Sequence, residues 1–194
     1  ALGLKGGDAR DHILAEIAQS WARHSPVNAL AWTSTLPPSA RARATSRALE
    51  SWSKTHPEKA AQYLDENPNP DYLKIITNEW SKRDPEATAN WITSKTESPQ
   101  RNSALADTLW HWTTQTPKSA TTWIEDLPAG NSRDQAIAGL AVAAVEFDPR
   151  SALEWSLKIT TPSLRNDLSQ HTFKAWSVTD PKIAQQWAND HQFF

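Results

Sequence analysis

The sequence predicts an all-α fold, built from about six two-helix units of roughly 32 residues each. Prolines recur at a nearly constant interval, tryptophans stand at fixed distances from those prolines, and the apolar residues between them follow helical spacing. The 194 residues include 11 Trp and 13 Pro but only 5 Gly. No segment shows the sustained alternation of a β-strand, so helices are the expected elements throughout.

Six prolines, called the marker prolines here, define the unit, and their successive spacings are 31, 28, 32, 32 and 32 residues. They are Pro26, Pro57, Pro85, Pro117, Pro149 and Pro181. Trp stands five residues before each marker except Pro149, where Ala144 takes its place. An aromatic residue stands six residues after every marker, and Ala, or once Thr88, stands three residues after it.

A short helix is expected to begin at each marker proline, because proline at the first helical position loses no hydrogen bond there. The preceding residue is a plausible N-cap at five of the six sites. These five residues are Ser25, Asp84, Thr116, Asp148 and Asp180, and His56 is the exception. The short helices are expected to end near Leu36, Asn67, Lys95, Leu127 and Ile159, and the last is expected near 181–190.

A longer helix is expected between consecutive short helices, with the tryptophan near its end. The other seven prolines fall in the break before it, so no proline lies inside a predicted helix. The first long helix carries Ile13, Leu14, Ile17 and Ala18 at amphipathic spacing before Trp21. The repeated tryptophans are therefore interpreted mainly as packing residues between helices.

The segment Pro26-x2-Ala29-x2-Trp32-x3-Leu36 resembles the tetratricopeptide repeat, and also the Trp- and Pro-marked helical repeats of bacterial proteins. The pattern departs from that family at Pro37 and Pro128, which replace its Gly or Ala, and in its shorter period. The resemblance implies an α-solenoid of antiparallel helix pairs, a superhelix that presents a concave surface to a partner.

The sequence thus predicts one α-solenoid domain over residues 1–194, with 1–7 a disordered leader or cloning remnant. The array begins on an unpaired long helix and ends on an unpaired short one, so we expect part of a longer array or end-to-end self-association. The chain lacks methionine, which is compatible with a processed, soluble protein exported to the periplasm, and the compartment stays open.

Composition and motifs argue against several classes of function. The formal net charge is −2, from 20 basic and 22 acidic residues, so no broad positive field favours nucleic acid. No apolar run approaches the ~20 residues of a membrane span. Cysteine is absent, the histidines form no pair at metal-binding spacing, and no phosphate-binding or nucleophile motif occurs. No catalytic residue, metal or cofactor is therefore assigned.

Trp110 is the one tryptophan that the repeating pattern leaves unexplained. The equivalent positions in the other units are mostly polar, namely Gln19, Glu50, Asn78, Val142 and Lys174. A tryptophan on such a face is a candidate contact with a partner, since interfaces are enriched in Trp. The alternative is a surface residue partly covered by a neighbouring helix.

Arginine recurs eleven residues before the tryptophan position of the long helix. Arg41, Arg101, Arg133 and Arg165 would form a stripe along a stack, and guanidinium groups pair bidentately with carboxylates. The stripe is a candidate site for an anion or acidic peptide. The alternative is a repeated structural contact, in which each arginine bonds a carbonyl or carboxylate of an adjacent unit.

The face of the short helices opposite their aromatic residue is polar and mildly acidic. It includes Gln62, Asn90, Glu125 and Glu154, which are candidate contacts for an extended or basic peptide, or simply a solvated face. Two functions from different classes follow. The first is a non-enzymatic scaffold that binds a protein or peptide, and the alternative is an enzyme, or part of one, with a pocket formed between repeats.

Overall fold

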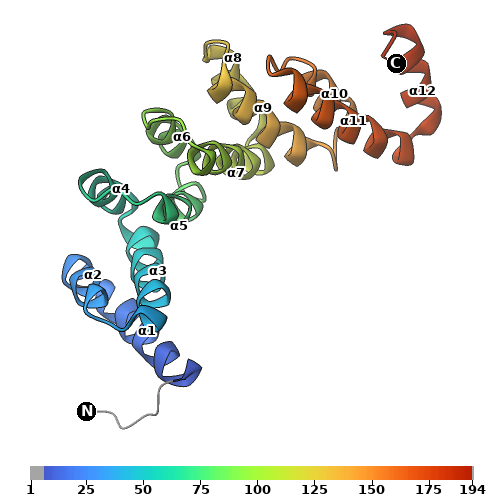
Figure 1. The fold of residues 1–194 in the computed structure, drawn as a ribbon. Coiled ribbons are helices and arrows are strands. Elements are labelled where there is room, and N and C mark those ends of the chain that lie inside the picture. The colour runs from blue at the N-terminus through green and yellow to red at the C-terminus, as the bar shows by residue number, and fades with distance from the viewer. Residues whose placement is uncertain (1–6, 194) are drawn as a thin grey trace. The chain divides into compact units, whose positions relative to one another are not determined.

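The computed structural model describes residues 7–193, which form twelve α-helices and no strand, so the predicted all-α class is confirmed (Figure 1). The expected disordered leader, apart from the exposed Gly7, lies outside the described residues. The helices are α1 (Asp8–Ala22), α2 (Pro26–Ser34), α3 (Pro38–Thr55), α4 (Pro57–Glu66), α5 (Pro70–Trp80), α6 (Pro85–Thr93), α7 (Pro99–Gln115), α8 (Pro117–Asp126), α9 (Asn131–Ala144), α10 (Pro149–Ser156), α11 (Pro162–Thr179) and α12 (Pro181–Asp190).

Proline sets where the helices begin. Every marker proline is the first residue of a short helix, as predicted, and four of the long helices also begin at a proline. Within residues 7–193, no proline occupies a later position in a helix. The fixed φ of proline and its missing N–H suit the first turn, where the amide would have no helical partner.

The predicted N-caps divide by side-chain type. The carboxylates of Asp84, Asp148 and Asp180 accept hydrogen bonds from backbone N–H groups of the first turn, at 2.9 to 3.3 Å. Ser25 and Thr116 make no such bond, so the prediction is wrong there. The backbone angles before the markers are nearly the same at all these sites. Both hydroxyls instead accept hydrogen bonds from side chains of the first turn, Ser25 from Asn28 and Thr116 from Ser119.

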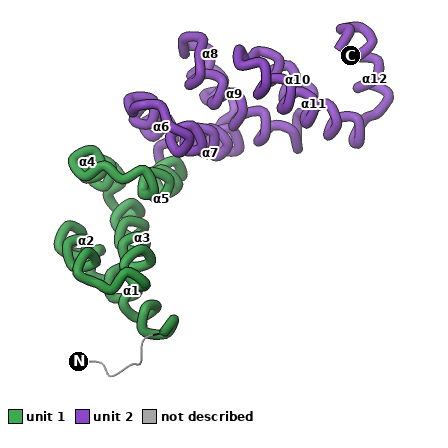
Figure 2. Tube along the Cα trace, in the orientation of Figure 1, with its two compact units in different colours: residues 1–83 green, residues 84–194 purple. Residues whose placement is uncertain are grey.

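The chain divides into two compact units, residues 1–83 and 84–194 (Figure 2). In the first unit the long helix α3 packs against both α1 and α5, and in the second α9 packs against both α7 and α11. Within each unit the short helices pack against the long helices that flank them in sequence. That the two units continue one stack, as the sequence predicts for a single domain, stays a prediction.

Small residues form much of the core. The residue three positions after each marker proline is completely buried, and these residues are Ala29, Ala60, Thr88, Ala120, Ala152 and Ala184. Two helices approach closely at Gly139 of α9, where a Cβ atom would collide with the backbone carbonyl of Ala106 on α7. Short side chains thus let neighbouring helices approach closely enough to exclude water.

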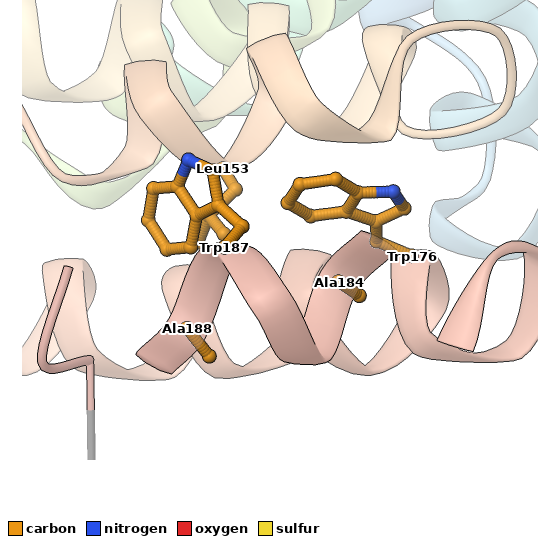
Figure 3. Packing of buried hydrophobic residues seen from close by; sticks show 5 residues of the cluster. All are labelled: Leu153, Trp176, Ala184, Trp187 and Ala188. Atoms are coloured by element: carbon orange, nitrogen blue, oxygen red, sulfur yellow. The ribbon is translucent and has the colours of Figure 1, made fainter. Parts of the chain in front are cut away.

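Aromatic pairs join four of the long helices, α1, α3, α7 and α11, to the short helix that follows each of them. Ring centroids lie 5.5 to 5.9 Å apart in Trp21–Trp32, Trp52–Tyr63, Trp112–Trp123 and Trp176–Trp187. Each pair spans its marker proline, and the long-helix members Trp52, Trp112 and Trp176 are buried while Trp21 is exposed. In the last pair the indoles of Trp176 and Trp187 pack with Leu153, Ala184 and Ala188 (Figure 3). The packing role expected for most of the repeated tryptophans is seen in these pairs.

Two tryptophans of α7 allow a matched test of this packing. Trp112 is 3% exposed, whereas Trp110, two positions earlier on the same helix, is 41% exposed. We expect Trp112→Ala to lower the free energy of unfolding by about 3–5 kcal/mol, because it empties a buried aromatic site. Trp110→Ala should change it by less than ~1 kcal/mol. Urea unfolding followed by far-UV circular dichroism measures both, and equal losses would contradict this account of α7.

A second test addresses the contact between α7 and α9. Gly139→Ala should destabilise the fold by about 1–3 kcal/mol or more, because the added methyl meets backbone that cannot turn away. Val142→Ala, at an exposed position of the same helix, is the control and should cost no more than ~0.5 kcal/mol. A thermal melt of Gly139→Ala that matches wild type would show that the two helices are not held at this distance.

Candidate functional site

Trp110 presents its indole on the solvent side of α7. Its side chain is 41% exposed, and its ring meets His111 edge to face with centroids 4.9 Å apart. An indole has a large apolar surface and one N–H donor, a combination common in protein interfaces. The structure therefore places Trp110 where a second molecule can reach it.

The polar candidates on the short helices are also exposed, and they belong to four different helices. Gln62 lies in the first unit and bonds Glu66, while Asn90, Glu125 and Glu154 lie on three different helices of the second. The Asn90 amide oxygen accepts the indole N–H of Trp123 at 2.9 Å, which ties α6 to α8. Glu154 pairs with Arg150 at 2.9 Å, so three of these four side chains already have protein partners.

Three of the four candidate arginines donate to carbonyl groups at or just beyond the C-terminal ends of short helices. Arg41 donates to Leu36 O, Arg165 donates to Ile159 O, and Arg101 donates to the carbonyls of Ile92 and Thr93, at 3.0 to 3.3 Å. These carbonyls lack helical hydrogen-bond partners, and a positive charge at this end of a helix also interacts favourably with the helix dipole. Such a carbonyl contact is what the alternative interpretation of the arginines, a repeated structural contact, predicts.

The remaining arginine behaves differently. The Nε atom of Arg133 is buried and has no hydrogen-bond partner among the described residues. Arg101, by contrast, is 2% exposed and also donates to Ser132 Oγ at 2.8 Å and Asn102 Oδ1 at 3.2 Å. The four arginines therefore share a sequence position without sharing one set of contacts.

Asp134 is a buried carboxylate at the start of α9, and sequence reasoning did not assign it a role. Its buried carboxylate accepts four hydrogen bonds of 2.7 to 2.9 Å, from the backbone N–H and hydroxyl groups of Thr160 and Thr161. Burial raises the pKa of this carboxyl, but the four donors outweigh it, so the pKa lies below its usual value. Asp134 fixes the turn before α11 to the start of α9.

A second carboxyl with a lowered pKa is Glu50 of α3. Its Oε1 atom lies 2.6 Å from Lys54 Nζ, and this hydrogen bond lowers the pKa of Glu50. Burial raises the pKa by a smaller amount, and the nearby charge of Arg47 lowers it further. All three side chains are partly exposed, so the pair adds little stability.

Three open cavities lie in the second unit. One of about 850 Å³ is bounded mainly by α11 and α12 and includes Arg165 and His191. One of about 540 Å³ lies against α8 and includes Trp123. The third, of about 310 Å³, is lined by residues from α7 to α10, among them Ala144 and Trp155. This third cavity lies where Ala144 replaces the repeated tryptophan, and that replacement is visible in the sequence.

Residues 7–193 hold no group of three or more His, Asp or Glu side chains that could bind a metal ion together. In that part of the chain, no helix has both the length and the apolar surface needed to cross a bilayer.

Comparison of the chain with protein-family models, with curated proteins and with solved structures gave no match.

The Asp134 contact makes a prediction about acid stability. Because its pKa is lower in the folded protein than in the unfolded chain, its contribution is complete above about pH 4 and is lost as the pH falls through the folded pKa. Asp134→Asn should cost about 1–3 kcal/mol at neutral pH, because the two backbone N–H groups bond different oxygens and the amide NH2 group would face one of these donors.

The same variant should also show a flatter decrease in stability between about pH 4 and pH 2 than wild type, as measured by urea unfolding at several pH values. Asp148→Asn is the matched control, because asparagine can still cap α10 through one oxygen. Parallel pH profiles of Asp134→Asn and wild type would exclude this carboxylate as the source of the effect.

Proposed function

We propose that the helix pairs stack as an α-solenoid and that the chain is a scaffold for binding a protein or peptide, with its contact surface centred on Trp110. The observation that carries the proposal is the exposed indole on α7, at a position where the other long helices have no aromatic residue. A partly exposed tryptophan gains more from burial in a complex than most other side chains do.

The arrangement of the other candidates supports this centre over the arginine stripe. Arg101 and Arg165 use guanidinium donors on helix carbonyls, which leaves fewer for an acidic ligand. Exposed Glu125 and the mildly acidic short-helix face of the second unit favour an extended or basic peptide segment as the partner.

The alternative, an enzyme with a pocket between repeats, has weaker support. The titratable groups lining the cavity of about 850 Å³ are Arg165 and His191. Arg165 donates to Ile159 O, and His191 stacks on Trp187 and lies 2.8 Å from its carbonyl oxygen. Both side chains thus have contacts that stabilise the local structure, whereas a catalytic pair would converge on a shared point.

Affinity capture from an extract of the source organism tests the proposed function. The bait is the purified chain as wild type, as Trp110→Ala, or as Val178→Ala, a control at a 79% exposed apolar position. We expect a partner retained by wild type and the control, with affinity reduced about 30-fold by Trp110→Ala, the loss typical of a binding hot spot.

Quantification of the retained proteins by mass spectrometry decides the outcome. Retention no higher than on the empty matrix would contradict the scaffold function. An identical partner list and affinity for Trp110→Ala would remove Trp110 from the contact surface.

A further inference from the structure

The cavity of about 310 Å³ lies where one unit departs from the pattern of the others. Ala144 stands five residues before Pro149, where the other marker prolines have a tryptophan. Trp155, six residues after that proline, is the short-helix member of an aromatic pair whose long-helix member is missing. Both residues line the cavity.

The preceding unit shows how an indole fits at this position. The Trp112 ring lies 5.7 Å from that of Trp123, and its Nε1–H donates to Ser119 Oγ at 2.9 Å. Ser119 stands two residues after Pro117, and Ser151 holds the equivalent place after Pro149. Ser151 also lines the cavity, so this unit keeps the aromatic neighbour and the hydroxyl acceptor but lacks the indole.

The remaining walls match an aromatic ring with one polar group. Leu140, Ala144, Phe147 and Trp155 contribute apolar surface. Thr113, Thr121 and Ser151 contribute polar side chains to the wall.

The size and openness of the cavity suit an indole that is still attached to a chain. A closed apolar cavity of ~150 Å³ holds benzene, and the volume here is about twice that. Phe147 is 58% exposed, and Lys118 and Asp148 are also exposed, so the cavity opens to solvent between them. Lys158 covers the Trp155 ring at 3.8 Å from its centroid but does not line the cavity.

We propose that this cavity binds the indole side chain of a tryptophan in the partner, in the place that Trp112 occupies in the preceding unit. The inference rests on the proposed scaffold function for the existence of a partner. The indole would pack against Trp155, and its N–H would donate to Ser151 Oγ.

Binding of N-acetyl-5-fluorotryptophanamide, followed by ¹⁹F NMR on the full chain, tests the site without interference from the eleven tryptophans of the protein. We expect saturable binding to wild type. Ala144→Trp should abolish it and raise the melting temperature, because the new indole fills the cavity. Val142→Trp adds the same residue at an exposed position of α9 and should leave binding unchanged.

A second variant isolates the proposed hydrogen bond. Methylation of the indole nitrogen of the probe should weaken binding to wild type about fivefold, the size expected for loss of one hydrogen bond. Ser151→Ala should bind both probes with equal affinity, and it retains the backbone N–H that caps α10 through Asp148. This comparison holds even if Ala144→Trp fails to fold.

The outcomes separate this inference from the proposed function. No saturable binding to wild type, or unchanged binding to Ala144→Trp, overturns the indole site. If free 5-fluoroindole binds but N-acetyl-5-fluorotryptophanamide does not, the occupant is not a tryptophan side chain of a partner. Probe binding without a captured protein contradicts only the scaffold function, and capture without probe binding contradicts only the indole site.

Discussion

The start of each short helix is the constraint on which the rest of the structure depends. A proline at the first position supplies a fixed φ and withholds an N–H that would have no partner. Once the helix begins there, the residues three and six positions later share one face. The small residue of that face is buried, and in four units the aromatic residue meets the tryptophan of the preceding long helix. At the opposite end, arginines from the next long helix bond the free carbonyls of several short helices.

Local constraints of this kind explain why the helix starts were predictable from the sequence and the helix ends less so. All six marker prolines begin helices, whereas α10 ends at Ser156, three residues before the expected end at Ile159. An end depends on which donor reaches the last carbonyls, and at Ile159 that donor is Arg165, from the next helix. The failed caps at Ser25 and Thr116 have a similar cause, because their hydroxyls bond other side chains of the first turn.

The residues of the candidate site divide in the same way, into those whose role the sequence predicts and those whose role depends on tertiary contacts. The exposure of Trp110 could be anticipated, because the positions equivalent to it in other units are mostly polar. The contacts of Asp134 could not, since its partners stand 26 and 27 residues later and are brought to it by the packing of helices. The requirement for glycine at position 139 likewise has no local signal in the sequence. It arises from the backbone of Ala106 on another helix, which leaves no room for a Cβ atom. The gap at Ala144 was visible in the sequence, but only the structure shows that no other side chain fills it.

The tilted aromatic pairs have an optical consequence as well as a mechanical one. Two indoles 5.7 to 5.9 Å apart, with ring planes inclined by 49° to 61°, are chiral arrangements of strongly absorbing chromophores. Their electronic transitions couple, so each such pair contributes a two-signed band to the ultraviolet circular dichroism spectrum. That band depends on the separation and tilt of the rings and disappears when they part. The chain therefore carries intrinsic reporters of whether a short helix still rests on its long neighbour, with no added label.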